Sequence, residues 1–154
     1  METLVVEPVV RDASRDDIAE LVWLESLARE QLPGQRGGAL WLERHPAQSP
    51  TWHAVDACEV VVGTIDEVPV SYLRFHVDDD VLYVDDVYVH PGAREVGLGD
   101  ALLAAAIERG VRAGAQRIEA EALPGDRDTK NLYERAAITA KRITVSAAIG
   151  DGAA

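Results

Sequence analysis

The stretch that decides the fold is Val84–Gly99, which reads VDDVYVHPGAREVGLG. An apolar-rich strand runs through a turn at Pro91 to the glycines Gly97 and Gly99, and an alanine-rich helix follows directly. Such a junction directs several backbone N–H groups to one point, with the positive end of the helix dipole behind them. Because glycine has no Cβ, a ligand can approach this backbone closely. The stretch therefore predicts a phosphate-binding site.

The composition indicates one domain over residues 1–150, followed by a short tail at residues 151–154. The chain has 154 residues, of which 47% are hydrophobic and 27% are charged. Its 27 Asp and Glu outnumber 15 Lys and Arg, which gives a formal net charge of -12. Nucleic-acid binders usually carry a basic face, so this balance argues against a nucleic-acid partner. The acidity is an ordinary aid to solubility, although it also suits a cationic or amine-bearing substrate.

The sequence lacks the features of a membrane span, a secretory signal or a metal site. No window approaches the roughly 18 apolar residues that a span requires, and the N-terminus lacks a basic region followed by an apolar stretch. Cys58 is the only cysteine, so no intrachain disulfide is possible, and its strand-like surroundings predict a buried side chain. The four histidines lack metal-ligand spacing. We expect a soluble, cytoplasmic protein without a metal.

Hydrophobic periodicity predicts an α/β domain with a mixed, mainly antiparallel sheet. Strand patterns occupy residues 5–11, 58–65, 68–76, 81–89, 117–123 and 141–149. Helical patterns occupy residues 14–30, 39–44, 97–113 and a segment that includes 132–134. The short connections between the second, third and fourth strands imply an antiparallel meander. Ser14 is the expected N-cap of the first helix.

On these residues the chain resembles the GNAT superfamily of acyl-CoA-dependent N-acetyltransferases. The family's pyrophosphate signature (Arg or Gln, two residues, Gly, one residue, Gly or Ala) matches Arg94, Gly97 and Gly99. The Val-x-Pro turn before it matches Val89-His90-Pro91, and the family's Leu-Tyr-Glu helix matches Leu132-Tyr133-Glu134. The order of elements also agrees over almost the whole chain. The resemblance implies a twisted, mostly antiparallel sheet of about six to seven strands, flanked by about four helices.

Two competing glycine motifs do not fit the same stretch. Gly97-Leu98-Gly99 is followed by Asp100-Ala101-Leu102, so the third glycine of the dinucleotide fingerprint is missing. The sequence has no Gly-Lys-Ser or Gly-Lys-Thr, which excludes a phosphate-binding P-loop.

The resemblance implies acetyl-CoA as the cosubstrate. In the family, the strand equivalent to residues 81–89 splays from the strand equivalent to 117–123, and the pantetheine arm inserts between them. Val87 and Val89 would then contact the acetyl group and the pantetheine through their main chain. Asp126 takes the place of a common asparagine and can still accept a hydrogen bond from the cofactor. The resemblance assigns the pyrophosphate to the backbone of the residues that follow Arg94, which are Glu95, Val96, Gly97, Leu98, Gly99 and Asp100.

Three residues are candidates for the chemistry. By resemblance, Tyr133 falls where many family members place a tyrosine that donates a proton to the CoA sulfur; alternatively it only anchors its helix to the sheet. Asp85 and Asp86 are adjacent in an otherwise apolar strand, so their side chains are expected on opposite faces. One of them would order a water that takes the amine proton, or hold the ammonium group directly. Asp85 is preferred for that role, and Asp86 for an internal structural bond.

The resemblance implies an N-acetyltransferase that acts on a primary amine, such as a small or polyamine-like acceptor, by direct attack on the thioester. One alternative is an acyl-CoA-binding sensor or interaction module with weak catalysis. Another is acetylation of a protein N-terminus or lysine, which requires an open groove beside the Leu32–Gly38 loop. A homodimer is possible, with the C-terminal strand at its interface. Ala137-Ile138 replaces the family's usual Gly-Phe, which predicts a differently shaped turn after Glu134.

Overall fold

The sheet of the protein is a five-stranded meander that ends in one parallel pairing. The computed structural model describes residues 7–48 and 50–150, so residues 5 and 6 of the predicted first strand lie outside the described part. The strands follow the order β1-β2-β3-β4-β5, in which β1 to β4 pair antiparallel and β4 pairs parallel with β5. They are β1 (Val9–Asp12), β2 (Val60–Ile65), β3 (Val68–Asp78), β4 (Val81–Val89) and β5 (Arg117–Ala120).

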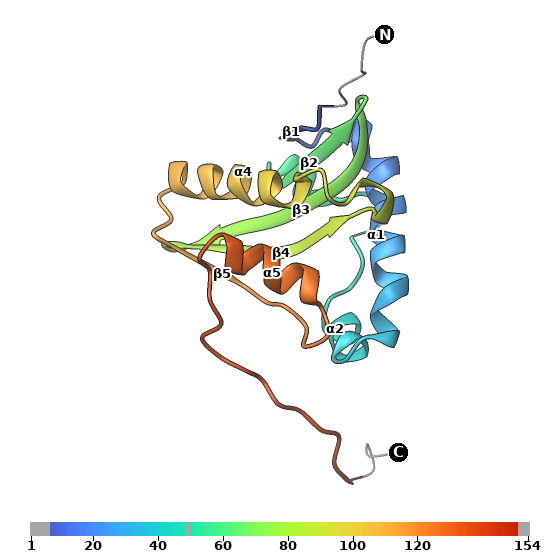
Figure 1. The fold of residues 1–154 in the computed structure, drawn as a ribbon, viewed down its shortest axis with the longest axis vertical. Coiled ribbons are helices and arrows are strands. Elements are labelled where there is room, and N and C mark those ends of the chain that lie inside the picture. Colours follow the sequence, from blue (N-terminus) through green and yellow to red (C-terminus); the bar gives the residue numbers. More distant parts are fainter. Residues whose placement is uncertain (1–6, 49, 151–154) are drawn as a thin grey trace.

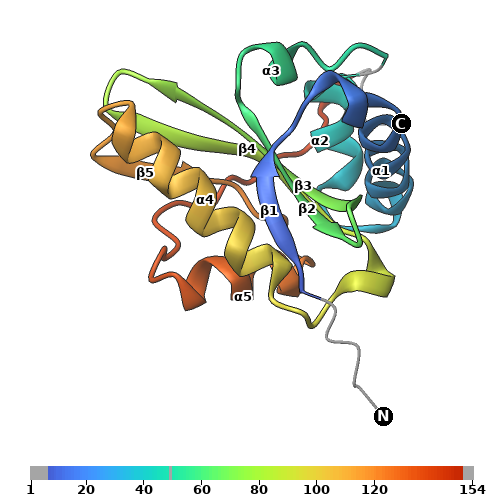
Figure 2. The ribbon, with the colours of Figure 1, turned by 90° about the horizontal axis from the view of Figure 1, so that it is seen from above.

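Helices cover both faces of this sheet (Figure 1), and α1 and α4 lie on opposite sides of it (Figure 2). Ser14 precedes the first helical turn, and its backbone N–H donates to Asp17 Oδ2 at 2.8 Å, so the predicted helix start is confirmed. Among the described residues, no helix combines the length and apolar character needed to cross a membrane. The α-helices are α1 (Ile18–Gln31), α2 (Gly38–Arg44), α3 (His53–Asp56), α4 (Leu98–Arg112) and α5 (Arg127–Arg135).

Each face of the sheet has its own hydrophobic core. Burial of apolar side chains on both faces is the main force that holds the layers together. On the α1 face, Leu21 and Leu24 of α1 pack with strand residues and with Trp52. On the α4 face, Leu102 and Leu103 of α4 pack with strand residues and with the α5 side chains Leu132 and Tyr133. The sheet thus separates α1 from the α4–α5 pair.

Two contacts fix the position of α4 on the sheet. A Cβ at Gly63 would lie 2.8 Å from Leu98 Cδ2 and 2.3 Å from Ser71 Oγ, so only glycine lets the first residue of α4 pack this closely on β2. Near the other end of α4, Arg109 Nε donates to Asp12 Oδ1 at 2.6 Å and ties the helix to β1. The start of α4 is therefore held against the middle of the sheet.

Several sequence predictions differ from the structure. Residues 141–149, predicted as a strand, form no strand, because they pair with none of the strands of the sheet. The described part of the chain has five strands instead of six to seven. The strand predicted to run from 117 to 123 ends at Ala120, where its pairing with β4 stops. Cys58 is exposed and has a φ of 57°, because it lies in the turn before β2 rather than in the strand.

The turn after α5 keeps the left-handed geometry that glycine usually supplies. Ala137 has a φ of 61°, so the predicted change of shape is wrong. The N–H groups of Ala137 and Ile138 donate to the carbonyl oxygens of Glu134 and Tyr133 at 3.0 and 2.9 Å. These two bonds close the end of α5 and hold Ala137 in a conformation that costs an alanine about 1 kcal/mol or more.

An Ala137→Gly substitution is therefore expected to raise the free energy of unfolding by about 1 kcal/mol, because glycine adopts this φ without strain. Chemical denaturation measures the change. Ala136→Gly is the matched control, since Ala136 has a φ of -90°. That variant is expected to lose about 0.5–1 kcal/mol. A loss of stability in both variants would contradict the prediction.

Candidate active site

A gap opens between β4 and β5 in the middle of β4. The two strands pair only from Val81 to Val84 on β4, opposite Arg117 to Ala120 on β5. From Asp86 to Val89, β4 keeps its pairing with β3 but has no described partner on the β5 side. Its main-chain N–H and C=O groups on that side are open to a ligand. The splay between these two strands that the family resemblance implied is present beyond Val84.

The loop between β4 and α4 ends in an uncapped helix N-terminus. Gly97 is the N-cap residue, has a φ of 80° and provides no side-chain hydrogen bond to the helix. The first intrahelical bond of α4 runs from the Ala101 N–H to the Gly97 carbonyl at 3.1 Å. The N–H groups of Leu98, Gly99 and Asp100 precede that bond, so they have no intrahelical acceptor. Such N–H groups, together with the helix dipole, are suited to bind an anion.

Charged side chains border this loop. Arg94 Nε donates to the Val89 carbonyl at 3.2 Å, and Arg94 Nη1 lies 3.5 Å from Asp128 Oδ2 on α5. Arg135 at the end of α5 donates to Asp100 Oδ1 at 3.0 Å, so α5 is tied to the loop at two points. Glu95 has a φ of 74°, and Val96 is exposed beside it. The loop is thus shaped by its backbone and flanked by two guanidinium groups.

Asp85 and Asp86 lie on the same face of the sheet, not on opposite faces. Arg74 on β3 is opposite Asp86 and Phe75 is opposite Val84, which leaves Asp85 as the extra residue of a β-bulge. Asp85 Oδ2 lies 2.6 Å from His76 Nδ1 and 3.8 Å from Arg74 Nη1. Because the bulge breaks the strand alternation, the expectation of opposite faces is wrong.

Asp86 is the carboxylate that faces the core of the α1 face. It accepts a hydrogen bond of 2.7 Å from the hydroxyl of Tyr72, which is fully buried in that core. Burial raises the pKa of Asp86 above its usual range, although the Tyr72 hydrogen bond and the Arg74 charge oppose the shift. Burial and the nearby Asp86 charge also raise the pKa of Tyr72. Asp86 is therefore a stronger base than an exposed aspartate.

Tyr133 reaches the same region from the other face. Its side chain is buried in the α4-face core. Burial raises the pKa of the Tyr133 hydroxyl well above its usual value, and the negative charges of Asp86 and Asp126 raise it further. The hydroxyl is therefore protonated at neutral pH and available as a hydrogen-bond donor. Val87 and Val89 of β4 pack against the same core, so Tyr133 lies on the α5 side of the strand that borders the gap.

Asp126 caps α5. Its Oδ1 accepts from the Thr129 N–H at 3.0 Å and its Oδ2 accepts from the Thr129 hydroxyl at 2.6 Å. Each carboxylate oxygen keeps a second lone pair, so the capping role leaves room for a contact with the cofactor.

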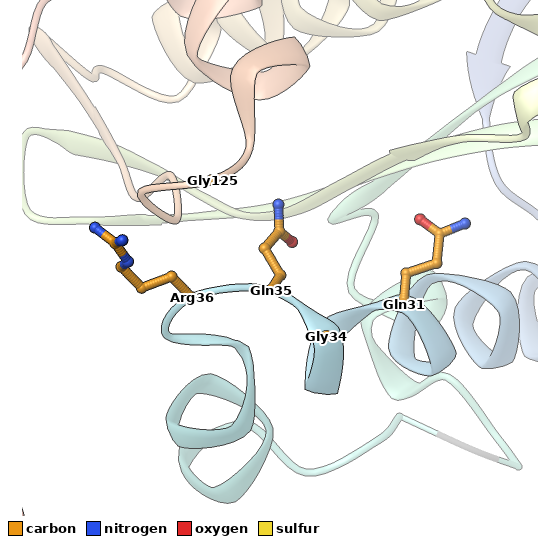
Figure 3. Close-up of a pocket in the computed structure, with 5 residues that line it drawn as sticks. All are labelled: Gln31, Gly34, Gln35, Arg36 and Gly125. Atoms are coloured by element: carbon orange, nitrogen blue, oxygen red, sulfur yellow. The ribbon is translucent and has the colours of Figure 1, made fainter.

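A hollow of about 440 Å³ lies beside the loop that follows α1. Figure 3 shows the Gln35 side chain directed toward the turn at Gly125, with Gln31 and Arg36 on either side. A Cβ at Gly125 would lie 3.5 Å from Gln35 Cγ, so this loop touches the turn that leads into α5. The loop at 32–38 therefore has the open space beside it that a bulky acceptor would need.

A comparison with models of known protein families shows to which family the chain belongs. The model of the acetyltransferase (GNAT) family matches residues 18–137. The chain belongs to the GNAT acetyltransferase family. It is accordingly an acyltransferase, and the predicted family and fold class are confirmed. No curated protein matches the sequence.

Solved structures resemble this GNAT acetyltransferase in fold at low sequence identity. The aminoglycoside N-acetyltransferase AAC(6')-Iy in complex with CoA is 13% identical, with a TM-score of 0.70 over 97% of this chain and 99% of that chain. PaiA N-acetyltransferase from Thermoplasma acidophilum in complex with CoA is 12% identical (TM-score 0.70; coverage 84% and 88%). A ribosomal-protein-alanine N-acetyltransferase from Brucella melitensis is 17% identical (TM-score 0.65; coverage 95% and 100%).

In this GNAT acetyltransferase the predicted site residues fall into two groups, one on each face of the sheet. The loop from Arg94 to Asp100 and Tyr133 belong to the α4–α5 side, and the aspartate pair belongs to the α1 side. The bonds from Tyr72 to Asp86 and from His76 to Asp85 were not predicted. The sequence of β3 indicated that such bonds could form, because its polar side chains recur at every second residue and so share one face. These side chains are Tyr72, Arg74 and His76.

Proposed function

We propose that the protein transfers an acetyl group from acetyl-CoA to a primary amine by direct attack. The observation that carries the proposal is the gap in the sheet at Asp85, which adjoins the uncapped start of α4 and has Tyr133 and Asp86 beside it. The sheet edge can receive an extended ligand, the helix N-terminus an anion, and the two side chains supply an acid and a base. No covalent enzyme intermediate is required.

The residues present fit acetyl-CoA. The main chain of Val87 and Val89 would hold the pantetheine arm in the gap, and the N–H groups from Glu95 to Asp100 would hold the pyrophosphate. Arg94 and Arg135 would add positive charge near the phosphates. The Val89 carbonyl would exchange its bond from Arg94 for one from the cofactor. When bound, acetyl-CoA supplies an activated thioester, so positioning accounts for much of the rate.

The contacts favour Asp86 over Asp85 as the base, which reverses the preference from sequence. Asp86 has a raised pKa, and its charge acts on Tyr133 across the gap. Asp85 is already engaged by His76, whose Nδ1 lies 2.6 Å from Asp85 Oδ2, and Arg74 Nη1 lies 3.8 Å from the same oxygen. Asp86 would accept the amine proton through an ordered water. Asp85 would then position the bulge rather than take the proton.

An Asp86→Asn variant is expected to lower kcat about 30-fold. The amide still accepts the Tyr72 hydrogen bond but takes up no proton. The effect is moderate because the amine can also lose its proton to solvent. In the native enzyme kcat is expected to fall as the pH drops through the raised pKa of Asp86, and this acid limb is expected to vanish in the variant. The measurement is the pH profile of kcat.

Asp85→Asn is the matched control, and it is expected to retain the acid limb. If Asp85→Asn loses the limb and Asp86→Asn keeps it, the roles are the reverse of those proposed here.

The acceptor is tested with an amine panel and acetyl-CoA, with release of the free CoA thiol as the signal. The panel contains a polyamine, an aminoglycoside, a peptide with an N-terminal alanine and a lysine peptide. The formal charge of -12 favours the cationic amines. The open hollow beside Gln35 leaves room for a bulky acceptor such as an aminoglycoside or a peptide. Binding of acetyl-CoA without turnover of any amine would support the sensor alternative.

A further inference from the structure

Arg74 is a largely buried guanidinium whose hydrogen bonds are incomplete. Its side chain is 17% exposed, and its Nε is buried without a hydrogen-bond acceptor among the described residues. Its ion pair with Asp85 spans 3.8 Å between Nη1 and Oδ2, which is too long for a hydrogen bond. Buried polar groups nearly always have a hydrogen-bond partner, so this side chain requires another explanation. What it provides at this place is its positive charge.

The charge of Arg74 lies beside both aspartates of β4. Arg74 is directly opposite Asp86 in the pairing of β3 with β4, and the register shifts immediately after it. Side chains that are directly opposite each other have Cβ atoms about 4.5–5.5 Å apart. Burial raises the pKa of Asp86, whereas the Tyr72 hydrogen bond and the Arg74 charge lower it. The register and the bulge thus bring two carboxylates to one guanidinium.

A further carboxylate, that of Glu25, faces Asp86 from α1. Glu25 is buried, and its two carboxylate oxygens accept the Gln48 N–H at 3.1 and 3.0 Å. Its negative charge raises the pKa of Asp86. His76 is positive only when protonated, whereas an arginine keeps its charge throughout the working pH range. The charged and titratable side chains around Asp86 come from α1, β3, β4 and α5. They are Glu25, Tyr72, Arg74, His76, Asp85 and Tyr133.

We propose that Arg74 keeps Asp86 ionised at neutral pH and thereby able to accept the amine proton. The inference rests on the role of Asp86 in the proposed function. The proton passes from the ammonium group through the ordered water to the carboxylate, which becomes a neutral acid and later releases the proton to solvent. Without the guanidinium, Asp86 would be a buried carboxylate beside two others, and such a group takes up a proton beforehand. Arg74 therefore acts on the reaction through Asp86 and needs no contact with the amine.

The pH profile of kcat tests this role. Arg74→Gln is expected to move the acid limb to higher pH. On the limb, kcat is expected to fall about tenfold below the native value, while the plateau at high pH stays within about threefold of it. Arg74→Lys keeps the charge and is expected to keep the limb near its native position. Arg15→Gln is the matched control, because it removes an exposed arginine that pairs with Asp56, and it is expected to leave the limb in place.

The outcomes separate this inference from the proposed function. An unmoved limb in Arg74→Gln, or an equal loss of kcat at every pH, would overturn the inference, while a native limb that Asp86→Asn abolishes would still support Asp86 as the base. A native enzyme without an acid limb would overturn both.

NMR of the aspartate carboxyl carbons measures the same effect without turnover. The Asp86 signal is identified by its absence from the Asp86→Asn variant. It is expected to titrate at higher pH in Arg74→Gln than in the native protein or in Arg74→Lys. If Arg74→Gln does not fold, Arg74→Met removes the charge without placing an amide in the buried site. A signal that titrates at the native pH in the variant without the charge would refute the role of Arg74.

Discussion

A Tyr133→Phe variant is expected to lose about 100- to 1,000-fold in kcat, with a change in the KM for acetyl-CoA of less than about threefold. The Tyr133 hydroxyl has a pKa raised by burial and by the charges of Asp86 and Asp126, so it remains protonated at neutral pH. We propose that it donates to the leaving sulfur when the thioester breaks. Phenylalanine retains the ring in the core and removes only that donor. Steady-state kinetics at saturating amine measure the effect.

Two controls separate this role from helix anchoring. Tyr83→Phe removes a hydroxyl from a β4 residue whose ring stacks on His76 with centroids 4.9 Å apart, and kcat is expected to be unaffected. Thermal unfolding of Tyr133→Phe is expected within a few degrees of the native protein. Unchanged turnover in Tyr133→Phe would show that the tyrosine is only an anchor between α5 and the sheet.

A Gly97→Trp variant is expected to weaken acetyl-CoA binding at least about 100-fold. Two effects combine. A residue with a Cβ is strained at a φ of 80° by about 1–2 kcal/mol, and the indole would cover the N–H groups at the start of α4. No atom lies within 4 Å of the Cβ position, so the substitution causes no clash within the protein itself. Isothermal titration of the native and variant proteins with acetyl-CoA measures the change.

Gly114→Trp is the matched control for this variant. Gly114 follows the other end of α4, has a φ of 91° and also has open space at its Cβ position. It imposes the same strain and the same side chain far from the loop, and is expected to bind acetyl-CoA normally. An equal loss of acetyl-CoA binding in both variants would show that the substitutions act by damaging the fold. Retained binding in Gly97→Trp would place the pyrophosphate elsewhere.

The loop and the helices around it could be predicted because their signals are local. Gly97 shapes the start of α4 through its own φ, and the neighbouring residues supply backbone groups whatever their side chains. The orientation of the aspartates could not be predicted in this way. It depends on the register of β4 against β3, in which Asp85 is the extra residue of a β-bulge. A register is set by how two strands pair, so the sequence of β4 alone does not reveal it.

The fate of the C-terminal segment shows the same distinction between local and long-range information. Alternation at Ile143 and Val145 predicts an extended chain, and the chain there is extended without helix. Alternation does not say which edge the chain joins, and in the described structure it joins none. The left-handed Ala137 was missed because the hydrogen bonds that close α5 outweigh the preference of alanine.

The division of the site by the sheet has a consequence for altering the enzyme. The groups proposed to hold the nucleotide come from the loop before α4 and from α5, while Gln31 ends α1 and Arg36 lies in the loop that follows it. Variation at Gln31 and Arg36 therefore alters the wall of the hollow without replacing a group proposed to bind the cofactor, whereas Gln35 touches the turn that leads into α5. A library confined to Gln31 and Arg36 would explore new amines while the groups proposed to bind acetyl-CoA stay unchanged.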